Sequence, residues 1–447
     1  MWRRPLVLVV ITGGAMALYG DTVGEGFGVN FHIPNNGNFK GFADGELETM
    51  SRMFKVARFD LKWANIETTC GEYDFSEFDP IVASFLGAGI RPYAILDYAN
   101  TCYADDDQVC SSDKCVDGYS AWARAVANHY SDLGYAGNMT FTSTNEPDND
   151  SMADISASTD FAMIKSAGQA FLDAGFDFTG GVTVGVDLDY QESLIDKGVL
   201  KYVAALSTHP YTHHDPEYKI EDLQNLRSYM DKNDGSKIKL LLDEWGYPYG
   251  GYPSGDDDPD SAANLLPRTW LVCLAFDLNC DLGIFFDWDG VYDSDSDSTN
   301  DLGRAATAFQ KRVGVSGYFD KLAPICTPPC DPGATQQRSS SNNNTTTGTP
   351  TVGFKYPTYA ARFKDAADDI RRFAVWTYPD SDDTAALGPA RTASSSGESV
   401  MIGSGKSNYC WNVYNYLDKK ADDQVCSDGD GNVQVDGVTE YPLYLAP

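Results

Sequence analysis

The chain has 447 residues, and its 65 Asp and Glu against 33 Lys and Arg give a formal net charge of −32 at pH 7. Such a charge argues against a nucleic acid or an anionic membrane surface as a partner, because both would repel it. A heavily solvated surface accounts for this charge better than the selection of a substrate does.

The first residues have the three parts of a secretory signal peptide. Arg3 and Arg4 precede an apolar stretch from Leu6 to Thr12, and Ala15-Met16-Ala17 supplies small residues for a cleavage site. We therefore expect a signal peptide over residues 1–17 and a secreted, extracellular protein. No stretch reaches the roughly 18 apolar residues that a membrane-spanning helix needs, so we expect no membrane span.

Cysteine usage agrees with secretion. Ten cysteines in a chain with a signal peptide favour disulfides over free thiols or metal ligands. The preferred local pairs are Cys326 with Cys330 and Cys410 with Cys426, whereas several pairings stay open among Cys70, Cys102, Cys110 and Cys115. Sequons at Asn138, Asn149, Asn343 and Asn344 predict a glycoprotein.

From Phe27 to Trp288, short apolar runs alternate with segments of helical period, a pattern typical of parallel strands joined by helices. The eight candidate strands are Phe27–Phe31, Val56–Leu61, Arg91–Asp97, Met139–Ser143, Val182–Val186, Ala205–His209, Ile238–Asp243 and Ile284–Asp287. Eight such units in about 260 residues predict an α/β fold, a (β/α)8 TIM barrel. We place this barrel over residues 21–325.

The remainder of the chain has a different pattern. After a helix near Ala305–Val313, residues 326–350 are rich in Ser, Asn and Thr and predict an exposed linker or insertion. Short alternating runs over residues 351–447 predict a small antiparallel β-sandwich domain. These runs are Tyr359–Phe363, Arg372–Trp376, Val400–Gly403, Cys410–Tyr416 and Val433–Val435.

Two of the candidate barrel strands lead into a glutamate. Glu146 follows the fourth strand in Ser143-Thr144-Asn145-Glu146-Pro147, and Glu244 follows the seventh in Leu241-Leu242-Asp243-Glu244-Trp245-Gly246. The carboxyl ends of all barrel strands open onto one face, so both carboxylates can reach one cleft. Retaining cleavage of a glycosidic bond needs such a pair, one to protonate the leaving oxygen and one to attack the anomeric carbon. The sequence therefore predicts a carbohydrate-cleaving enzyme.

At this point the chain resembles glycoside hydrolase clan A, whose acid/base follows strand four and whose nucleophile follows strand seven. It is most similar to family 39 and the family 5-like enzymes, through Arg58-Phe59-Asp60-Leu61-Lys62-Trp63, Ile66-Glu67, Gly71-Glu72-Tyr73-Asp74-Phe75 and Thr208-His209-Pro210-Tyr211. The resemblance implies a retaining hydrolase of β-linked oligo- or polysaccharides. Asp243-Glu244-Trp245 departs from the family 39 pattern, so the sugar, its linkage and endo or exo action stay open. We expect a monomer with no cofactor and no metal.

The resemblance implies a role for each matching carboxylate. Glu146 would be the general acid/base, with its pKa raised by burial and by the second carboxylate. Glu244 would be the nucleophile, held charged and oriented by Arg58 and Tyr211. Asn145 would bind the sugar 2-hydroxyl.

Two ring side chains are further candidates. We expect His209 to line the site, with a hydrogen-bonded core position as the alternative. We expect Trp288 to be the apolar floor for the sugar ring, with packing at the barrel end as the alternative. His213 and His214 lack a carboxylate at metalloprotease spacing, which favours an ordinary loop over a metal site.

A different class of function is compatible with the same fold. The chain could be a catalytically inactive, secreted carbohydrate-binding protein built on the same barrel. That alternative is favoured if the carboxyl groups of Glu146 and Glu244 lie well beyond about 6 Å apart.

Overall fold

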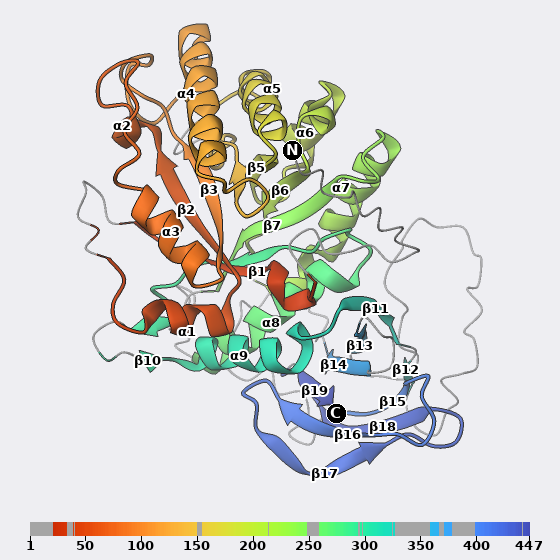
Figure 1. Cartoon of the computed structure of the whole chain (residues 1–447). Helices are drawn as coiled ribbons and strands as arrows, with labels where there is room; N and C mark the ends of the chain where they lie inside the picture. Colours follow the sequence, from red (N-terminus) through yellow and green to blue (C-terminus); the bar gives the residue numbers. More distant parts are fainter. Residues whose placement is uncertain are drawn as a thin grey trace, which may run out of the picture.

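Eight parallel strands, hydrogen-bonded in chain order from β1 to β8, form a closed barrel (Figure 1). The computed structural model describes residues 21–33, 39, 41–149, 154–212, 214–247, 259–293, 296, 298–323, 325–326, 358–365, 371–377, 398–439 and 441–447. The expected signal peptide lies outside these residues. The barrel strands are β1 (Phe27–Asn30), β2 (Val56–Lys62), β3 (Arg91–Asp97), β4 (Thr140–Thr142), β5 (Asp177–Val184), β6 (Ala205–His209), β7 (Lys239–Trp245) and β8 (Gly283–Phe285). The predicted (β/α)8 barrel is confirmed.

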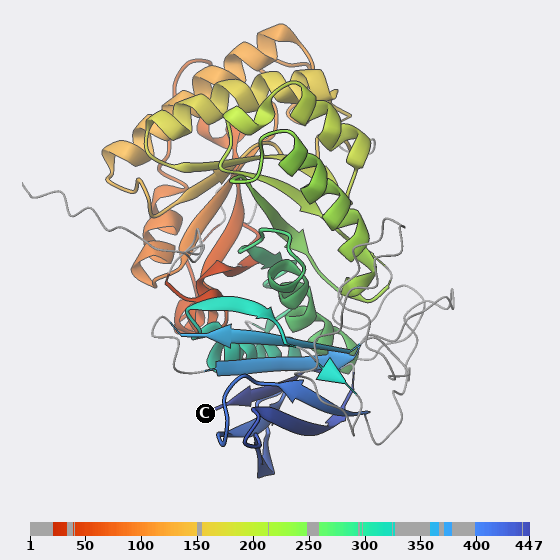
Figure 2. The same cartoon turned by 90° about the vertical axis from the view of Figure 1, so that its right-hand side faces the viewer.

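Helices surround the barrel and join its strands (Figures 1 and 2). They are α1 (Glu46–Met53), α2 (Trp63–Ile66), α3 (Asp79–Gly87), α4 (Asp113–Asp132), α5 (Ala157–Asp173), α6 (Leu188–Asp196), α7 (Ile220–Lys232), α8 (Pro259–Ala275) and α9 (Asp301–Phe309). Short polar side chains begin several of them: Ser112, Ser156 and Asp187 each accept a hydrogen bond from a backbone N–H in the first turn of α4, α5 and α6. Such caps satisfy N–H groups that have no partner within the helix.

Two antiparallel sheets follow the barrel. One has the order β11-β13-β14-β19-β16-β17 and the other the order β12-β15-β18. Their strands are β11 (Tyr318–Leu322), β12 (Ile325–Cys326), β13 (Thr358–Lys364), β14 (Arg371–Thr377), β15 (Glu398–Gly403), β16 (Cys410–Asn415), β17 (Lys420–Cys426), β18 (Asn432–Val438) and β19 (Leu443–Ala446). The first strands of these sheets thus come from residues 318–326, almost all of which we had placed in the barrel.

Strand β14, inside the six-stranded sheet, is buried on both faces. On β14, Phe373 and Val375 belong to a core shared with strands β15 and β18 of the smaller sheet, whereas Ala374 and Trp376 belong to the core of the barrel. Alternation along the strand explains this division, because successive side chains point to opposite faces. The sheet therefore attaches the C-terminal region to the barrel beside α8 and α9 (Figures 1 and 2).

Four disulfides lie within the described part of the chain. They join Cys70 to Cys102, Cys110 to Cys115, Cys273 to Cys280 and Cys410 to Cys426. The expected pair of Cys410 with Cys426 is confirmed, whereas Cys330, which we had paired with Cys326, lies outside the described residues.

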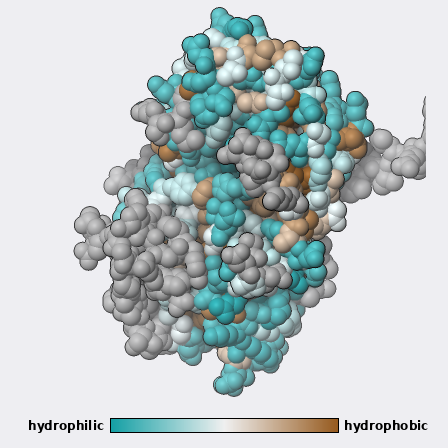
Figure 3. Space-filling model, turned by 90° about the vertical axis from the view of Figure 1, so that its left-hand side faces the viewer, coloured by the Kyte–Doolittle hydropathy of each residue, from teal (hydrophilic) through white to brown (hydrophobic). Residues whose placement is uncertain are grey.

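Among the coloured residues of the face seen in Figure 3, hydrophilic ones predominate, and apolar ones appear in separate patches. This surface agrees with the formal net charge of −32. None of the described helices has the length and apolar character needed to cross a membrane.

Candidate active site

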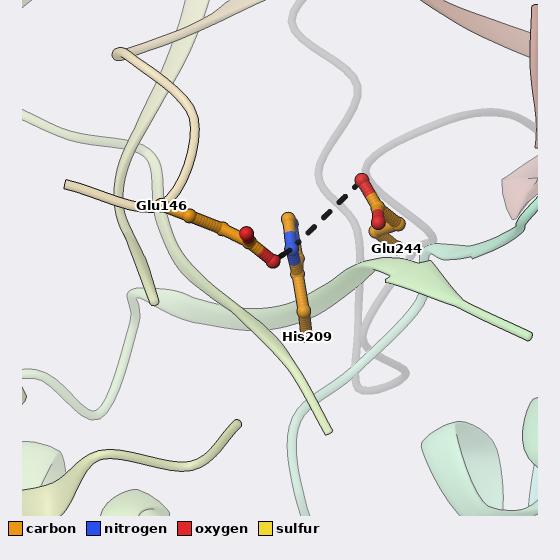
Figure 4. Close-up of side chains that lie close together, drawn as sticks. All are labelled: Glu146, His209 and Glu244. Carbon is orange, nitrogen blue, oxygen red and sulfur yellow. Dashed lines mark hydrogen bonds and ion pairs between the residues drawn. The ribbon is translucent and has the colours of Figure 1, made fainter. Parts of the chain in front are cut away.

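Three side chains from different strands meet at the carboxyl ends of the barrel strands. Glu146 follows β4, His209 ends β6 and Glu244 lies near the end of β7. One oxygen or nitrogen atom from each side chain lies within 4.8 Å of the others. Figure 4 shows the two carboxylates on either side of the imidazole. The structure thus brings together the two glutamates that the sequence singles out.

Arg58 on β2 connects the groups at this centre. Its guanidinium is buried, and Nη1 donates to Glu244 Oε2 at 2.8 Å and to Asn30 Oδ1 at 2.9 Å. Nη2 donates to Asn145 Oδ1 at 2.6 Å. A planar guanidinium held by three partners has one orientation, so the charge beside Glu244 is fixed in place.

Glu244 receives a second hydrogen bond from Tyr211, whose hydroxyl lies 2.9 Å from Oε1. Burial and the charge of Glu244 raise the pKa of Tyr211, so the phenol keeps its proton and remains a donor. With Arg58 on one oxygen and Tyr211 on the other, both carboxylate oxygens accept a hydrogen bond and the group has a fixed orientation. Arg58 and Tyr211 thus both contact Glu244, as the resemblance implies.

An irregularity in β7 places two consecutive acidic residues at the same centre. Leu242 pairs with Gly283 and Trp245 with Phe285, so β7 has one residue more than β8 between these pairs. Consecutive side chains of a regular strand point to opposite faces, but an extra residue re-aims one of them. Accordingly, Asp243 Oδ2 lies 3.6 Å from Arg58 Nε while Glu244 contacts Arg58 Nη1.

Asp243 is fully buried and ionised. Burial alone would favour the neutral acid, but Arg58 and His209 lower the pKa of Asp243 to about 2. Its Oδ2 also accepts a hydrogen bond of 2.9 Å from Tyr93, and its Oδ1 contacts the hydroxyl of Ser207. Asp243 therefore adds a negative charge beside Arg58 and His209.

His209 lies between carboxylates on both sides. Nδ1 is 2.7 Å from Glu146 Oε1 and 3.8 Å from Glu244 Oε2, and Nε2 is 3.2 Å from Asp243 Oδ1. Burial opposes a charged imidazole, but the charge of Glu244 and the hydrogen bonds to Asp243 and Glu146 raise the pKa of His209 to about 10. The ring is thus buried, as the core interpretation expects, and it contacts both glutamates.

The expectation of a raised pKa for Glu146 is wrong in this substrate-free structure. Burial does favour the neutral acid, but the hydrogen bond and charge of His209 outweigh it and lower the pKa of Glu146. Asn149 adds a hydrogen bond of 3.0 Å to Oε2. The sequence does not show that a cation would lie so close. The backbone of Glu146 also has φ of 43°, in the left-handed region that costs a non-glycine residue about 1–2 kcal/mol.

Asn145 is held on both its backbone and its side chain. Its backbone N–H donates to Asp97 Oδ1 at 2.8 Å, and its side-chain oxygen accepts from Arg58. With the amide oxygen turned toward Arg58, the NH2 group is the donor on the other branch of the amide, and a sugar hydroxyl could accept from it.

Trp288 is not an apolar floor of the cleft. Its side chain is 2% exposed, its Nε1 donates to Glu46 Oε1 at 2.9 Å, and its ring stacks on Tyr292. The correct alternative is packing at the barrel end. The exposed aromatic residue after β8 is Phe286, which is 37% exposed and whose backbone N–H donates to Trp245.

Sequence reasoning missed several polar residues that complete the centre. Asn30 ends β1, Asp97 ends β3 and Asp243 precedes Glu244 on β7. A polar residue at the carboxyl end of a barrel strand is a usable signal, because that end faces the cleft. His213 lies outside the described residues.

The same spacing would suit a metal ion bound by Glu146, His209 and Glu244. However, His209 Nδ1 already lies at hydrogen-bond distance from Glu146, and the guanidinium of Arg58 already neutralises Glu244. A further cation would lie beside that guanidinium and be repelled by it. We assign no metal to this centre.

No protein-family model and no curated protein matches the chain. Among solved structures, it is similar to a family 39 glycoside hydrolase from the gut symbiont Bacteroides cellulosilyticus WH2, with a TM-score of 0.67 and 14% identity over 96% of this chain and 81% of that one. The chain has the fold of the clan A glycoside hydrolases. A glucosidase from Croceicoccus marinus gives a TM-score of 0.58 with 16% identity over 97% of this chain and 98% of that one. A conserved exported protein from Bacteroides fragilis gives 0.60 with 11% identity over 97% and 98% of the respective chains. The resemblance noted from the sequence is confirmed at the level of the fold.

Proposed function

We propose that this protein is a retaining glycoside hydrolase that cleaves β-linked glycosides through a covalent glycosyl-enzyme. Glu244 is the nucleophile and Glu146 is the general acid/base. Arg58, Tyr211, Asn145 and His209 bind or orient these groups and the sugar. The clan A fold supports the class of reaction, and the side chains at the centre support the assignment of roles.

One observation carries the proposal: a side-chain oxygen of Glu146 and one of Glu244 lie within 4.8 Å of each other. Retaining enzymes hold their two carboxyl groups about 5–5.5 Å apart, whereas inverting enzymes need about 6.5–9.5 Å to admit a water molecule. The short separation therefore favours direct attack by one carboxylate. It gives no support to the inactive binding protein, which a much wider separation would favour.

In the first step, Glu244 attacks the anomeric carbon while Glu146 delivers a proton to the leaving oxygen. The hydrogen bonds from Arg58 at 2.8 Å and Tyr211 at 2.9 Å aim the nucleophile. As the ester forms, the charge on Glu244 disappears. Asn145 then stabilises the oxocarbenium-like transition state through the 2-hydroxyl, a contact that contributes several kcal/mol in such enzymes.

In the second step, Glu146 removes a proton from water, which attacks the same carbon and releases Glu244. Two inversions give net retention of the anomeric configuration. For the apolar face of the sugar ring we propose Phe286 in place of Trp288, because Phe286 is exposed at the end of β8.

We propose further that the protein is secreted. The four disulfides within the described residues support an oxidising compartment, because such bonds are rare in the cytosol. The predicted signal peptide over residues 1–17 supports the same location.

A screen of polysaccharides and aryl β-glycosides with reducing-end detection tests this function, followed by proton NMR of the first product of any substrate found. We expect the β-anomer to appear first and to mutarotate later. The matched control is Glu48→Gln on the exposed side of α1, which should hydrolyse the same substrate at the rate of the parent. An initial α-anomer, or no hydrolysis across the panel, contradicts the proposal.

A further inference from the structure

The contacts of His209 are not explained by a role in orienting the other side chains of the site. Both of its ring nitrogens face a carboxylate, Nδ1 toward Glu146 at 2.7 Å and Nε2 toward Asp243 at 3.2 Å. An ionised carboxylate only accepts hydrogen bonds, whereas a neutral imidazole has one donor and one acceptor nitrogen. Two donors on one ring require the imidazolium form, unless one of the carboxylates is protonated.

The surrounding charges decide where that proton lies. Asp243, fully buried and held by Tyr93 and Ser207, stays ionised, so Nε2 carries a proton. Arg58 Nη2 carries two N–H groups; one donates to Asn145 at 2.6 Å, and the nitrogen also lies 3.4 Å from Nε2. The contact between Nε2 and Asp243 Oδ1, at 3.2 Å, is shorter. Nε2 is therefore a donor.

The second proton lies between Nδ1 and Glu146. Arg58 is the nearest other cation, and it is engaged with Glu244. If His209 were neutral, the positive charge of Arg58 alone would have to balance the carboxylates of Asp243 and Glu244. The carboxylate of Glu146, beside Nδ1, would have no positive charge in contact with it. A charged imidazole balances this excess of negative charge, and the pKa of about 10 for His209 agrees with the charged form.

Other titratable groups face the same centre. Asp97 on β3 has a pKa raised well above its usual range by burial and by Asp60, and its Oδ1 accepts hydrogen bonds from the backbone N–H of Asn145 and the hydroxyl of Thr144. Tyr211 donates its hydroxyl to Glu244 and keeps its proton, as described above.

We propose that Glu146 and His209 hold the catalytic proton as a pair, and that His209 stores it in the substrate-free enzyme. His209 is thus a positioning residue and a proton reservoir that acts through Glu146. This inference rests on the proposed function, since it assigns the source of the proton in that reaction.

The proton balance closes over one cycle. In the first step the leaving oxygen takes a proton from Glu146, which takes the Nδ1 proton, so His209 becomes neutral while the charge on Glu244 is lost in the ester. In the second step water gives a proton to Glu146 and its hydroxyl to the sugar. That proton returns to His209 as Glu244 leaves with its negative charge. The net charge of the centre is the same before and after each step.

Nitrogen-15 NMR of the histidines in the intact protein tests where the proton lies, without any substrate. We expect both nitrogens of His209 to carry a proton at pH 8 and to lose one only as the pH rises toward about 10. A neutral ring at pH 8, or titration near the ordinary value of about 6.5, overturns the proposal. His129, which lies 2.8 Å from Asp79 in a partly exposed pair, provides an internal reference.

His209→Gln then tests the use of the proton, because glutamine retains a hydrogen-bond donor but does not titrate. We expect kcat/KM to fall about 100-fold for aryl glycosides with poor leaving groups and to change little for dinitrophenyl glycosides. The basic limb of the pH profile should move to lower pH. His129→Gln makes the same change far from the site and should leave both measurements unaltered. Equal losses for all leaving groups, or an unmoved basic limb, contradict the proposal.

The two experiments separate this inference from the proposed function. If no glycoside is hydrolysed by the parent protein, the proposed function fails, while NMR still reports the protonation of His209. If the parent hydrolyses glycosides with retention but His209 is neutral, the function stands and the reservoir is wrong.

Discussion

Arg58 and Glu244 lie on strands β2 and β7 and are joined by a hydrogen bond of 2.8 Å between Nη1 and Oε2. The same guanidinium binds Asn30 and Asn145, so three strand ends converge on one planar group. A buried charge fixed in this way orients the carboxylate before any sugar binds. Such preorganisation is worth far more inside a cleft than in water.

Arg58→Lys tests the need for the planar group, because lysine keeps the charge but not the fork of donors. We expect kcat/KM to fall by at least about 100-fold, as when one preorganised donor is removed. The free energy of unfolding should fall by about 1–3 kcal/mol, since buried acceptors lose their donors. Arg52→Lys in the exposed pair with Glu48 is the control and should change stability by less than about 0.5 kcal/mol. Kinetics and chemical denaturation measure both effects; near-parent activity of Arg58→Lys contradicts this role.

Glu146→Ala separates the acid/base from the nucleophile. A dinitrophenyl leaving group needs little protonation, so the glycosyl-enzyme should still form and then wait for a base to activate water. Added azide needs no deprotonation and should restore turnover, giving a β-glycosyl azide. Product NMR identifies this compound. An α-azide, or rescue of Glu244→Ala but not of Glu146→Ala, means that the two roles are reversed.

Trp376 links the C-terminal sheet to the barrel. Its Nε1 donates to Glu217 Oε1 at 2.7 Å, and Glu217 is also bound by Arg268 on α8. Trp376→Phe keeps an aromatic ring but removes this donor, so we expect the free energy of unfolding to fall by about 1–3 kcal/mol through that loss alone.

Trp270→Phe is the matched control for this measurement. Trp270 is equally buried, but its Nε1 has no hydrogen-bond partner among the described residues. Both substitutions lose the same ring volume, so the difference between their unfolding free energies isolates the hydrogen bond to Glu217. Equal losses of stability show that the hydrogen bond contributes nothing to the attachment of the sheet.

The barrel could be predicted because its signals are local. Apolar runs mark the strands, and a glutamate after the fourth and within the seventh strand identifies the cleft face without any knowledge of contacts. Asn145, His209 and Tyr211 meet in the structure for the same reason, since each lies at or just beyond a strand end, and Arg58 reaches them from within β2.

What could not be predicted depends on contacts between distant segments. The pKa of Glu146 is set by His209, and neither residue indicates the other in the sequence. Trp288 and Phe286 are both aromatic residues near the end of β8, and only the packing against Tyr292 and Glu46 shows which one is buried. The strand Tyr318–Leu322 precedes the polar segment that seemed to divide the domains, and its pairing with β13 becomes visible only in the folded sheet.

The central claim is that Glu244 forms the covalent bond to the sugar. Incubation with a mechanism-based fluorosugar matched to a substrate from the screen, followed by peptide mass spectrometry, tests it most directly. We expect one sugar per chain, attached to Glu244, and no labelling of Glu244→Gln, because an amide cannot form the ester. Labelling of a different carboxylate, or labelling of Glu244→Gln as fast as the parent, would contradict the assignment.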